Sequence, residues 1–389
     1  MYDFSKETNR FNTTSLKWDV KESELPMWVA DMDFEVCPEI LKAMRERFDN
    51  HIFGYNIIPN EWYNAYILWW KNKHNYVIDK DWLLFSTGVV PSISSIVRRL
   101  TLPGEKVLIQ TPVYNIFFNS IINNGRFVLE SPLKYENHEY SIDFKDLEEK
   151  LSDPQVSLMI LCNPHNPIGK IWDKETLERI GHLCLKHNVV VISDEIHCDI
   201  TNPGVSYVPF QSVSEECRMN SIMCIAPTKA FNIAGLQTSA LCIPNPVLRH
   251  RVNRGLNNDE IAEGNTFACV AAIAAFNYGM TWNKEMREYI YNNKQYVLSE
   301  LEKKLPSVYA IKQDSTYLMW VDVSTITDDS VKLTKYSREK TGLYISDGEE
   351  YGESGRCFVR INVATQFSRV KDGTKRFIDG IKMYIKDNK

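Results

Sequence analysis

Residues 221–235, SIMCIAPTKAFNIAG, decide the fold class of this chain. The first five residues are apolar throughout, as expected of a short strand that is buried on both faces. Lys229 follows this run closely, among small and apolar neighbours. A lysine in such a place would be desolvated, and desolvation lowers the pKa of an amine. The stretch therefore predicts a buried strand that leads to a reactive amine, with a lysine that extends to the surface as the alternative.

Similar apolar runs lie on both sides of this stretch in the sequence. They are residues 106–110, 127–130, 158–162, 189–193 and 238–243. Between them, residues 173–187 and 247–256 have the apolar spacing of amphipathic helices. Because strands and helices alternate, we expect an α/β fold with a mostly parallel sheet covered by helices.

The last third of the chain has a different pattern. A long helix is expected over residues 283–304, followed by a strand at 317–323, a helix at 330–341 and short strands at 343–346 and 357–362. This order predicts a smaller α+β domain, and 389 residues favour two domains. We place an N-terminal segment that packs with the small domain at residues 1–48. The large domain is predicted at 49–283 and the small domain at 284–389.

The composition excludes several classes of protein. The net charge is -5 and no basic stripe is present, so we expect no nucleic-acid partner. No apolar run reaches the ~18 residues of a membrane span, and the polar start has no signal-peptide pattern. The 9 cysteines form no C-x-x-C pair, so we expect reduced thiols in a cytoplasmic protein and no metal site.

Three further motifs follow predicted strands or precede a predicted helix. Thr87–Ser94 (TGVVPSIS) places Gly88 before a helix with Pro91 in its first turn. A helix N-terminus offers free N–H groups to a phosphate, although an ordinary strand-to-helix turn would have the same pattern. Asn163–Gly169 (NPHNPIG) contains two Asn-Pro pairs. These would make a rigid loop, in which Asn166 binds a ligand oxygen or serves only a structural turn.

The third motif is Ser193–His197 (SDEIH), at the end of a predicted strand. A buried carboxylate at Asp194 is costly unless a cation pairs with it, and a protonated pyridine nitrogen is such a cation. Alternatively, Asp194 could form an ion pair with a Lys or Arg side chain, or it could cap the N-terminus of a helix. His197 could equally be a core residue. Together the motifs supply an imine-forming amine, an anion, an oxygen ligand and a phosphate seat. Pyridoxal phosphate (PLP) requires these groups.

On these motifs the chain resembles the PLP enzymes of fold type I. Residues 28–34 (WVADMDF), 88–92 (GVVPS), 111–114 (TPVY) and 228–235 (TKAFNIAG) are similar to one branch of the class I and II aminotransferase family. That branch contains cystathionine β-lyases, cystalysin and the MalY and PatB proteins. The resemblance extends over nearly the whole chain, to Arg360.

The resemblance implies a role for each matching residue. Lys229, next to Thr228, would carry PLP as a Schiff base, and Asp194 would pair with the pyridine nitrogen. Asn166 would bind the phenolic oxygen and Tyr114 would stack on the ring. The remaining roles are phosphate binding by Gly88, Val89, Val90 and the partner subunit's Tyr55, and substrate binding by Arg360, Asn166, Trp28 and Asp31.

Three positions depart from the usual aminotransferase pattern. His197 stands where many of those enzymes have Tyr, Ala226 where many have Ser, and Gln237 where many have Arg. The last two departures remove phosphate ligands, so we expect phosphate binding to depend more on the helix N-terminus and on Tyr55. His197 could still donate a hydrogen bond toward the phenolic oxygen.

The implied activity is that of a carbon–sulfur β-lyase in a cytoplasmic homodimer with shared active sites. The substrate would be a sulfur amino acid such as L-cystathionine or L-cysteine, cleaved to pyruvate, ammonia and a thiol. The same residues could serve an aminotransferase. A regulatory protein that keeps the fold is a further alternative, although every catalytic position is filled.

Overall fold

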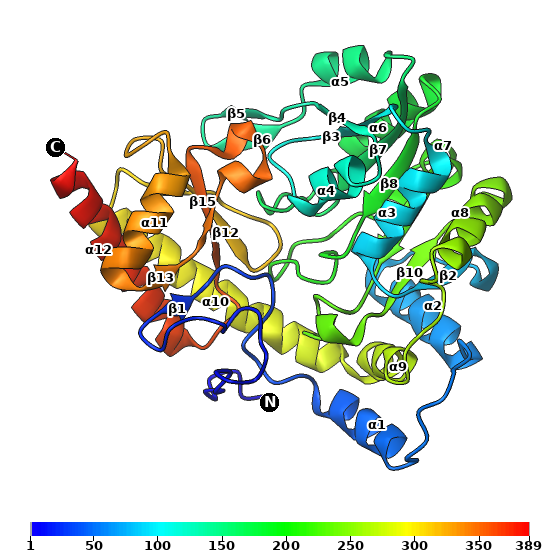
Figure 1. Ribbon diagram of the computed structural model, residues 1–389, viewed down its shortest axis with the longest axis horizontal. Helices are drawn as coiled ribbons and strands as arrows, with labels where there is room; N and C mark the ends of the chain where they lie inside the picture. The colour runs from blue at the N-terminus through cyan, green and yellow to red at the C-terminus, as the bar shows by residue number, and fades with distance from the viewer. Residues whose placement is uncertain (1, 389) are drawn as a thin grey trace.

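The computed structural model describes residues 2–388, which form a seven-stranded sheet, a four-stranded sheet, two small two-stranded pairs and the helices that cover the sheets (Figure 1). The larger sheet has seven strands in the order β2-β10-β9-β8-β7-β3-β4. Their bounds are β2 Leu83–Ser86, β3 Lys106–Ile109, β4 Phe127–Glu130, β7 Val156–Cys162, β8 Val190–Asp194, β9 Ser221–Ile225 and β10 Ser239–Cys242. Strand β10 is antiparallel to both neighbours, and the strands from β9 to β4 are parallel. The predicted α/β class with a mostly parallel sheet is confirmed.

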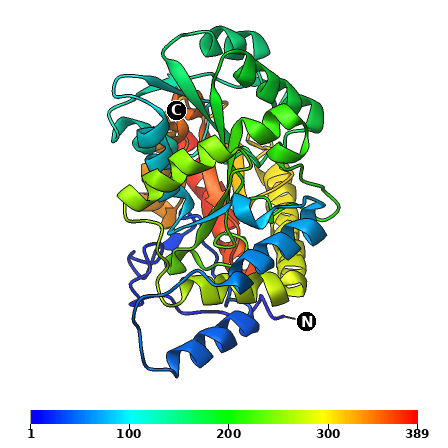
Figure 2. The same cartoon turned by 90° about the vertical axis from the view of Figure 1, so that its right-hand side faces the viewer.

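Helices cover both faces of this sheet, as the turned view shows (Figure 2). Alternate residues of one strand face opposite layers: Ile160 belongs to the core under α3, whereas Leu161 belongs to the core under α6. Both side chains are buried, which explains why the strands are apolar throughout. The helices of this region are α2 Asn60–His74, α3 Val89–Leu100, α4 Ile116–Ile122, α5 Phe144–Leu151, α6 Lys174–Lys186, α7 Glu215–Met219, α8 Pro246–Asn258 and α9 Ala268–Tyr278. A short hairpin, formed by β5 Lys134–Glu136 and β6 Glu139–Ser141, directly precedes α5 in the sequence.

The smaller sheet has the order β11-β12-β15-β14. Its strands are β11 Tyr309–Ala310, β12 Leu318–Asp322, β14 Ser346–Asp347 and β15 Phe358–Asn362, and its helices are α11 Ser330–Thr341 and α12 Phe367–Asp387. Helix α10, Met280–Lys304, runs between the two parts of the molecule (Figure 1). The single strand predicted at residues 343–346 is wrong in detail. The chain there forms β13 Leu343–Tyr344 and then β14, because the two pieces pair with different partners.

The N-terminal segment contacts both parts. Strand β1, Leu25–Pro26, pairs in parallel with β13, and helix α1, Pro38–Phe48, packs on α9. The domain limits at residues 48 and 283 stay a prediction. Among residues 2–388, no helix is both long enough and apolar enough to cross a membrane. All 9 cysteines fall within this range and are free thiols.

Candidate active site

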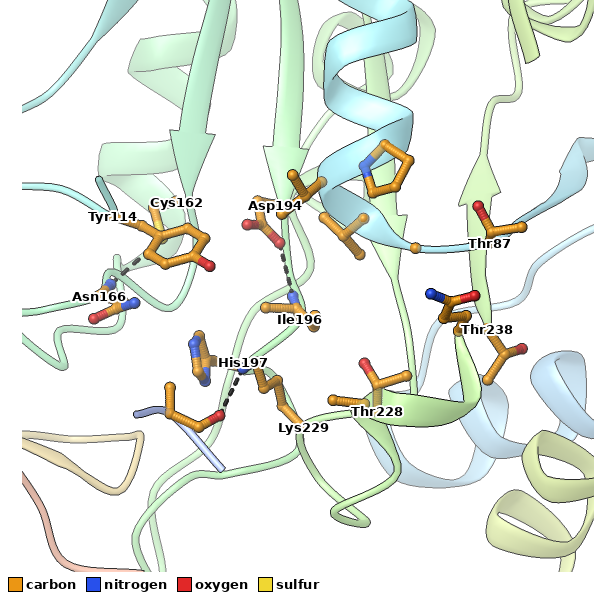
Figure 3. A pocket seen from close by; sticks show the side chains of 17 residues that line it. Thr87, Tyr114, Cys162, Asn166, Asp194, Ile196, His197, Thr228, Lys229 and Thr238 are labelled. Carbon is orange, nitrogen blue, oxygen red and sulfur yellow. Dashed lines mark hydrogen bonds between the residues drawn. The ribbon is translucent and has the colours of Figure 1, made fainter. Parts of the chain in front are cut away.

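The carboxyl edge of the larger sheet carries a cavity of about 250 Å³ (Figure 3). The parallel strands β8 and β9 end there: Asp194 is the last residue of β8, and Lys229 follows β9. Because β10 is antiparallel, its beginning lies at the same edge, and Thr238 just before it also lines the cavity. The topology therefore brings together the ends of five strands that run in one direction, β2, β3, β7, β8 and β9, and the beginning of the reversed strand β10, as expected for an open α/β sheet.

Most of the site residues predicted from the sequence line this one cavity. They are Gly88, Val89, Val90, Tyr114, Asn166, Asp194, His197, Thr228 and Lys229. Sequence reasoning did not assign a role to Thr87, Cys162, Ile196 or Thr238, which line it as well. No sequence pattern marked Thr238 as a site residue, because its place at the cavity depends on the reversed direction of β10.

Lys229 is the amine of the cavity, and its side chain is enclosed by protein. Its Nζ donates a hydrogen bond of 2.6 Å to the backbone oxygen of Ala30. Burial lowers the pKa of Lys229 to about 8, and the nearby positive charge of Arg360 acts in the same direction. Asp31 and Asp194 oppose this effect. A substantial fraction of this lysine is therefore neutral near pH 8, as imine chemistry requires.

Asp194 is a buried carboxyl group, 4% exposed, at the end of β8. It accepts a hydrogen bond from the backbone N–H of Ile196, at 3.2 Å. Burial raises the pKa of Asp194 to about 7, against the weaker effects of that hydrogen bond and of Lys229. Within residues 2–388 it forms no ion pair. A cation placed in the cavity would supply the missing counter-charge, and a protonated pyridine nitrogen fits that requirement.

The opposite end of the cavity has the features of a phosphate seat. Helix α3 begins at Val89, so the N–H groups of Val89 and Val90 have no partner within the helix. Pro91 has no N–H and therefore leaves no third donor unsatisfied. A Cβ atom at Gly88 would lie 3.2 Å from the Pro91 ring, which explains why the smallest residue precedes the helix. The seat can hold an anion through backbone groups and the helix dipole.

Asn166, Tyr114 and His197 form the walls between these two ends (Figure 3). The Asn166 side chain accepts a hydrogen bond of 3.4 Å from Nη1 of Arg360. The Tyr114 ring projects into the cavity, where it could cover one face of a planar ring. Burial lowers the pKa of His197 to about 3, so its imidazole is neutral, and Nδ1 has no hydrogen-bond partner among the described residues.

Arg360 lies behind the cavity wall, on β15 of the smaller sheet. It is 5% exposed, donates to the backbone oxygen of Trp28 at 2.9 Å, and lies over the ring of Tyr351. No carboxylate among residues 2–388 forms an ion pair with it, and its Nε has no partner. A buried guanidinium without a counter-anion is suited to binding a carboxylate ligand.

Besides Arg360, three further predicted residues do not line the cavity. The Trp28 ring stacks on Tyr344, with 4.8 Å between the ring centres. Asp31 is held by Arg10, whose two Nη atoms lie 3.1 and 2.7 Å from its carboxylate oxygens. Tyr55 is fully exposed in the extended segment before α2. The substrate roles of Trp28 and Asp31, and the role of Tyr55 across subunits, stay predictions.

Tyr317 is a candidate that sequence reasoning missed. Its hydroxyl donates to the backbone oxygen of Ala30 at 3.0 Å, the same oxygen that Lys229 contacts. It precedes β12 of the smaller sheet and lies far from Lys229 in the sequence, so no local pattern could reveal the contact.

A buried amine of lowered pKa, a buried carboxyl without a cation and a helix N-terminus thus surround one cavity on a fold of type I. Together they define a PLP-dependent enzyme. Pyridoxal 5′-phosphate fits this site, because it has a ring nitrogen for the carboxyl group, an aldehyde for the amine and a phosphate for the helix N-terminus. The chain belongs to the aminotransferase class I and II family, whose family model matches residues 25–372.

Individual relatives agree with this assignment. The chain is 40% identical over 381 residues to cystathionine β-lyase PatB of Bacillus subtilis, which covers 96% of this chain and 98% of that protein. It is 32% identical to protein MalY of Escherichia coli, over 98% of this chain and 99% of MalY. The crystal structure of cystalysin from Treponema denticola, which contains pyridoxal 5′-phosphate, superposes with a TM-score of 0.95. That pair is 31% identical, and the match covers 98% of this chain and 99% of cystalysin.

Proposed function

We propose that this PLP-dependent enzyme is a carbon–sulfur β-lyase. Its substrate would be a sulfur-containing L-amino acid such as cystathionine or cysteine. The observation that carries the choice of reaction is the 40% identity, over nearly the full length of both chains, to a protein named cystathionine β-lyase. The geometry of the cavity supports chemistry at the α-carbon of an amino acid and would serve an aminotransferase equally well.

PLP, when bound, supplies an electron sink for the negative charge that develops at the substrate α-carbon. Arg360 binds the substrate carboxylate and thereby orients the α-carbon toward Lys229. Neutral Lys229 then takes the α-proton, since its pKa of about 8 suits a base near neutral pH. Asp194 keeps a negative charge at the edge of the cavity where the pyridine nitrogen would lie.

Elimination completes the reaction without any oxidant. The bond between the β-carbon and sulfur breaks, the sulfur leaves with the electron pair, and Lys229 returns a proton to the thiolate. The three-carbon product, aminoacrylate, reacts with water to give pyruvate and ammonia. The overall reaction consumes one water and yields one thiol.

We further propose that the enzyme acts as a homodimer in which Tyr55 reaches the phosphate in the partner subunit. Large apolar side chains around Tyr55 are exposed, between 52% and 80% for Ile52, Phe53 and Ile57. Such an exposed apolar segment on a single subunit is typical of a protein–protein interface.

The reaction is tested with the purified PLP-loaded protein and L-cystathionine, without any keto acid. We expect sustained and equimolar release of pyruvate, ammonia and homocysteine. Conversion of the cofactor to its amine form, with turnover only after a keto acid is added, would identify an aminotransferase instead. No reaction with cystathionine, cysteine or cystine under either condition would favour a regulatory role.

A further inference from the structure

A second pocket, of about 540 Å³, lies outside the active site between the end of α2 and the start of α10. We name it the cationic pocket and define it by six of its lining residues: Lys73, His74, Thr201, Tyr207, Lys284 and Arg287. None of the acidic residues between positions 2 and 388 lines it. Three permanently basic side chains converge here, although the net charge of the whole chain is -5.

These three basic side chains have no anionic partner among residues 2–388. Lys73 donates to the neutral amide oxygen of Asn283 at 2.6 Å. Arg287 donates to the hydroxyl of Thr201 at 2.8 Å, and its Nε is buried without a partner. Burial lowers the pKa of both Lys73 and Arg287, although the charge of nearby Asp199 opposes this effect in each case. An anion in the pocket would therefore relieve an electrostatic cost that the folded chain already bears.

A second buried polar group also lacks a partner. Tyr207 is 8% exposed and lines the pocket, and its hydroxyl forms no hydrogen bond with any described residue. A buried hydroxyl without a partner costs about 1–3 kcal/mol. Like Nε of Arg287, this hydroxyl is a buried donor without a partner among the described residues.

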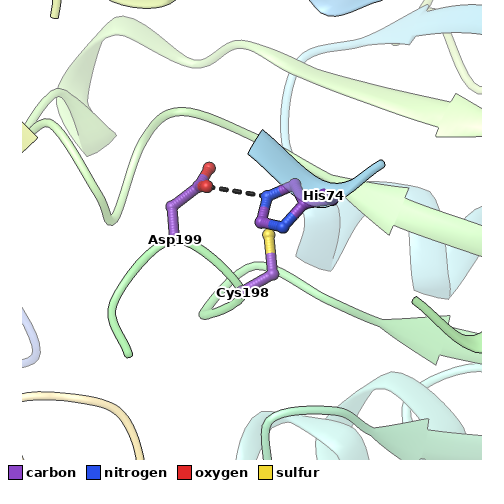
Figure 4. Close-up of side chains that lie close together, drawn as sticks. All are labelled: His74, Cys198 and Asp199. Carbon is purple, nitrogen blue, oxygen red and sulfur yellow. Dashed lines mark hydrogen bonds and ion pairs between the residues drawn. The ribbon is translucent and has the colours of Figure 1, made fainter. Parts of the chain in front are cut away.

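His74 and Cys198 line the pocket and Asp199 lies next to them, close enough together to suggest a metal site (Figure 4). The bonding argues against a metal. Both Asp199 oxygens accept hydrogen bonds from Trp69 Nε1, and His74 Nε2 lies 2.9 Å from Oδ1. Burial also raises the pKa of the Cys198 thiol well above its usual value, which keeps it protonated. The nearby positive charges of Lys73 and Arg287 further disfavour a metal cation at Asp199.

We propose that the cationic pocket binds a compact dianion of the phosphate kind. A tetrahedral oxyanion has enough acceptor atoms for the two lysines, the guanidinium of Arg287 and the adjoining hydroxyls. The segment that contributes Cys198 to the pocket leads directly from the active site, because Cys198 follows His197 and Asp199 lies five residues after Asp194. The pocket is thus placed to couple anion binding to the position of the cofactor-binding segment.

The test is titration calorimetry of the PLP-loaded enzyme with inorganic phosphate at constant ionic strength. Loading with PLP fills the other phosphate seat, so any remaining saturable binding belongs elsewhere. We expect saturable binding to the wild type and at least ~10-fold weaker binding to Arg287→Met, since a charge-assisted hydrogen bond is lost. The matched control is Lys303→Met, an exposed residue at the far end of α10, which should bind phosphate like the wild type.

Lys284→Met provides a second variant, because Lys284 is exposed and its replacement should not disturb folding. We expect it to weaken phosphate binding as well. Tighter binding of succinate than of phosphate would overturn the assignment of the ligand class. Absence of saturable binding to the wild type, or equal affinity of the wild type and both pocket variants, would overturn the site itself.

Discussion

Lys229 and Ala30 lie 199 residues apart in the sequence, yet the lysine Nζ is 2.6 Å from the alanine backbone oxygen. The contact joins the loop after β9 to the N-terminal segment. The same segment supplies the backbone oxygen of Trp28 to Arg360. The two basic groups assigned to chemistry and substrate binding are therefore both positioned by residues 28–30.

This arrangement makes the buried ion pairs beneath that segment important for stability. Asp33 is 2% exposed and accepts hydrogen bonds from Lys17 at 2.9 Å and from Trp18 Nε1 at 2.8 Å. Although burial opposes ionisation, Lys17 and the other donors lower the pKa of Asp33 to about 2. Since the folded pKa lies below the unfolded value, this carboxylate stabilises the protein above about pH 4, and the effect is lost as the pH falls through 2.

We expect Asp33→Asn to reduce the free energy of unfolding at pH 7 by about 3 kcal/mol, because Lys17 would stay buried without its main partner. Urea unfolding measures the change. The control is Glu35→Gln, which breaks only the exposed pair with Lys6 and should cost less than about 1 kcal/mol. Equal effects of the two variants would contradict the role given to Asp33.

Asp194→Asn should have opposite effects on the cofactor-free and PLP-loaded proteins. In the cofactor-free protein the folded pKa of about 7 exceeds the unfolded value, so stability falls as the pH rises through 7. A neutral Asn should therefore raise the melting temperature at pH 8, and the gain should shrink toward pH 4. In the PLP-loaded protein the same change removes the negative charge that pairs with the pyridine ring, so it should lower the melting temperature.

Thermal melts at both pH values, with and without PLP, provide the test. The pKa of Glu195 is also raised, to about 8. Because Glu195 is present in both the wild type and the Asp194→Asn variant, the difference between these two reports mainly on Asp194. The control is Asp328→Asn at an exposed position. Destabilisation of the cofactor-free protein at pH 8 would show that Asp194 has a structural partner instead.

Arg360→Lys should weaken substrate use and leave the cofactor in place. A lysine keeps the charge but loses the planar fork that binds a carboxylate through two hydrogen bonds. We expect kcat/KM to fall at least ~10-fold, the equivalent of one charge-assisted hydrogen bond. Steady-state kinetics and PLP content are measured together, with the exposed Arg356→Lys as the control. Loss of PLP in parallel with activity would assign Arg360 to cofactor binding.

The position of Tyr55 can be tested by mixing two variants. If Tyr55 acts on the neighbouring subunit, Tyr55→Ala and Lys229→Ala subunits should complement each other. A mixed dimer would have one site with both native residues, since each chain supplies what the other lacks. We expect activity to recover after the variants are unfolded and refolded together, but not after separate refolding. Failure to recover, with mixed dimers demonstrated, would place both residues in the same subunit's site.

The sequence predicted much of this arrangement because strands buried on both faces are apolar throughout. Strands β4 and β9 and helix α11 were predicted with their observed bounds. Motifs that directly follow a strand, such as those at Asp194 and Lys229, were placed correctly at the cavity. Their positions depend only on local order along the chain.

Contacts that depend on the tertiary path could not be predicted. Thr238 reaches the cavity only because β10 runs against its neighbours, and nothing in residues 238–243 specifies a direction. Tyr317 reaches Ala30 from the smaller sheet. Strand β2, Leu83–Ser86, was not predicted, although β4 of the same length was.

The central claim is that Lys229 holds the cofactor, and chemical trapping tests it most directly. The PLP-loaded enzyme is treated with borohydride, which reduces an imine to a stable secondary amine, and is then digested for mass spectrometry. The account predicts a pyridoxyl group on the peptide that contains Lys229. Lys294 is the rival, because it is also buried and its pKa is lowered to about 7. A pyridoxyl group on Lys294, or on any lysine other than Lys229, would contradict the account.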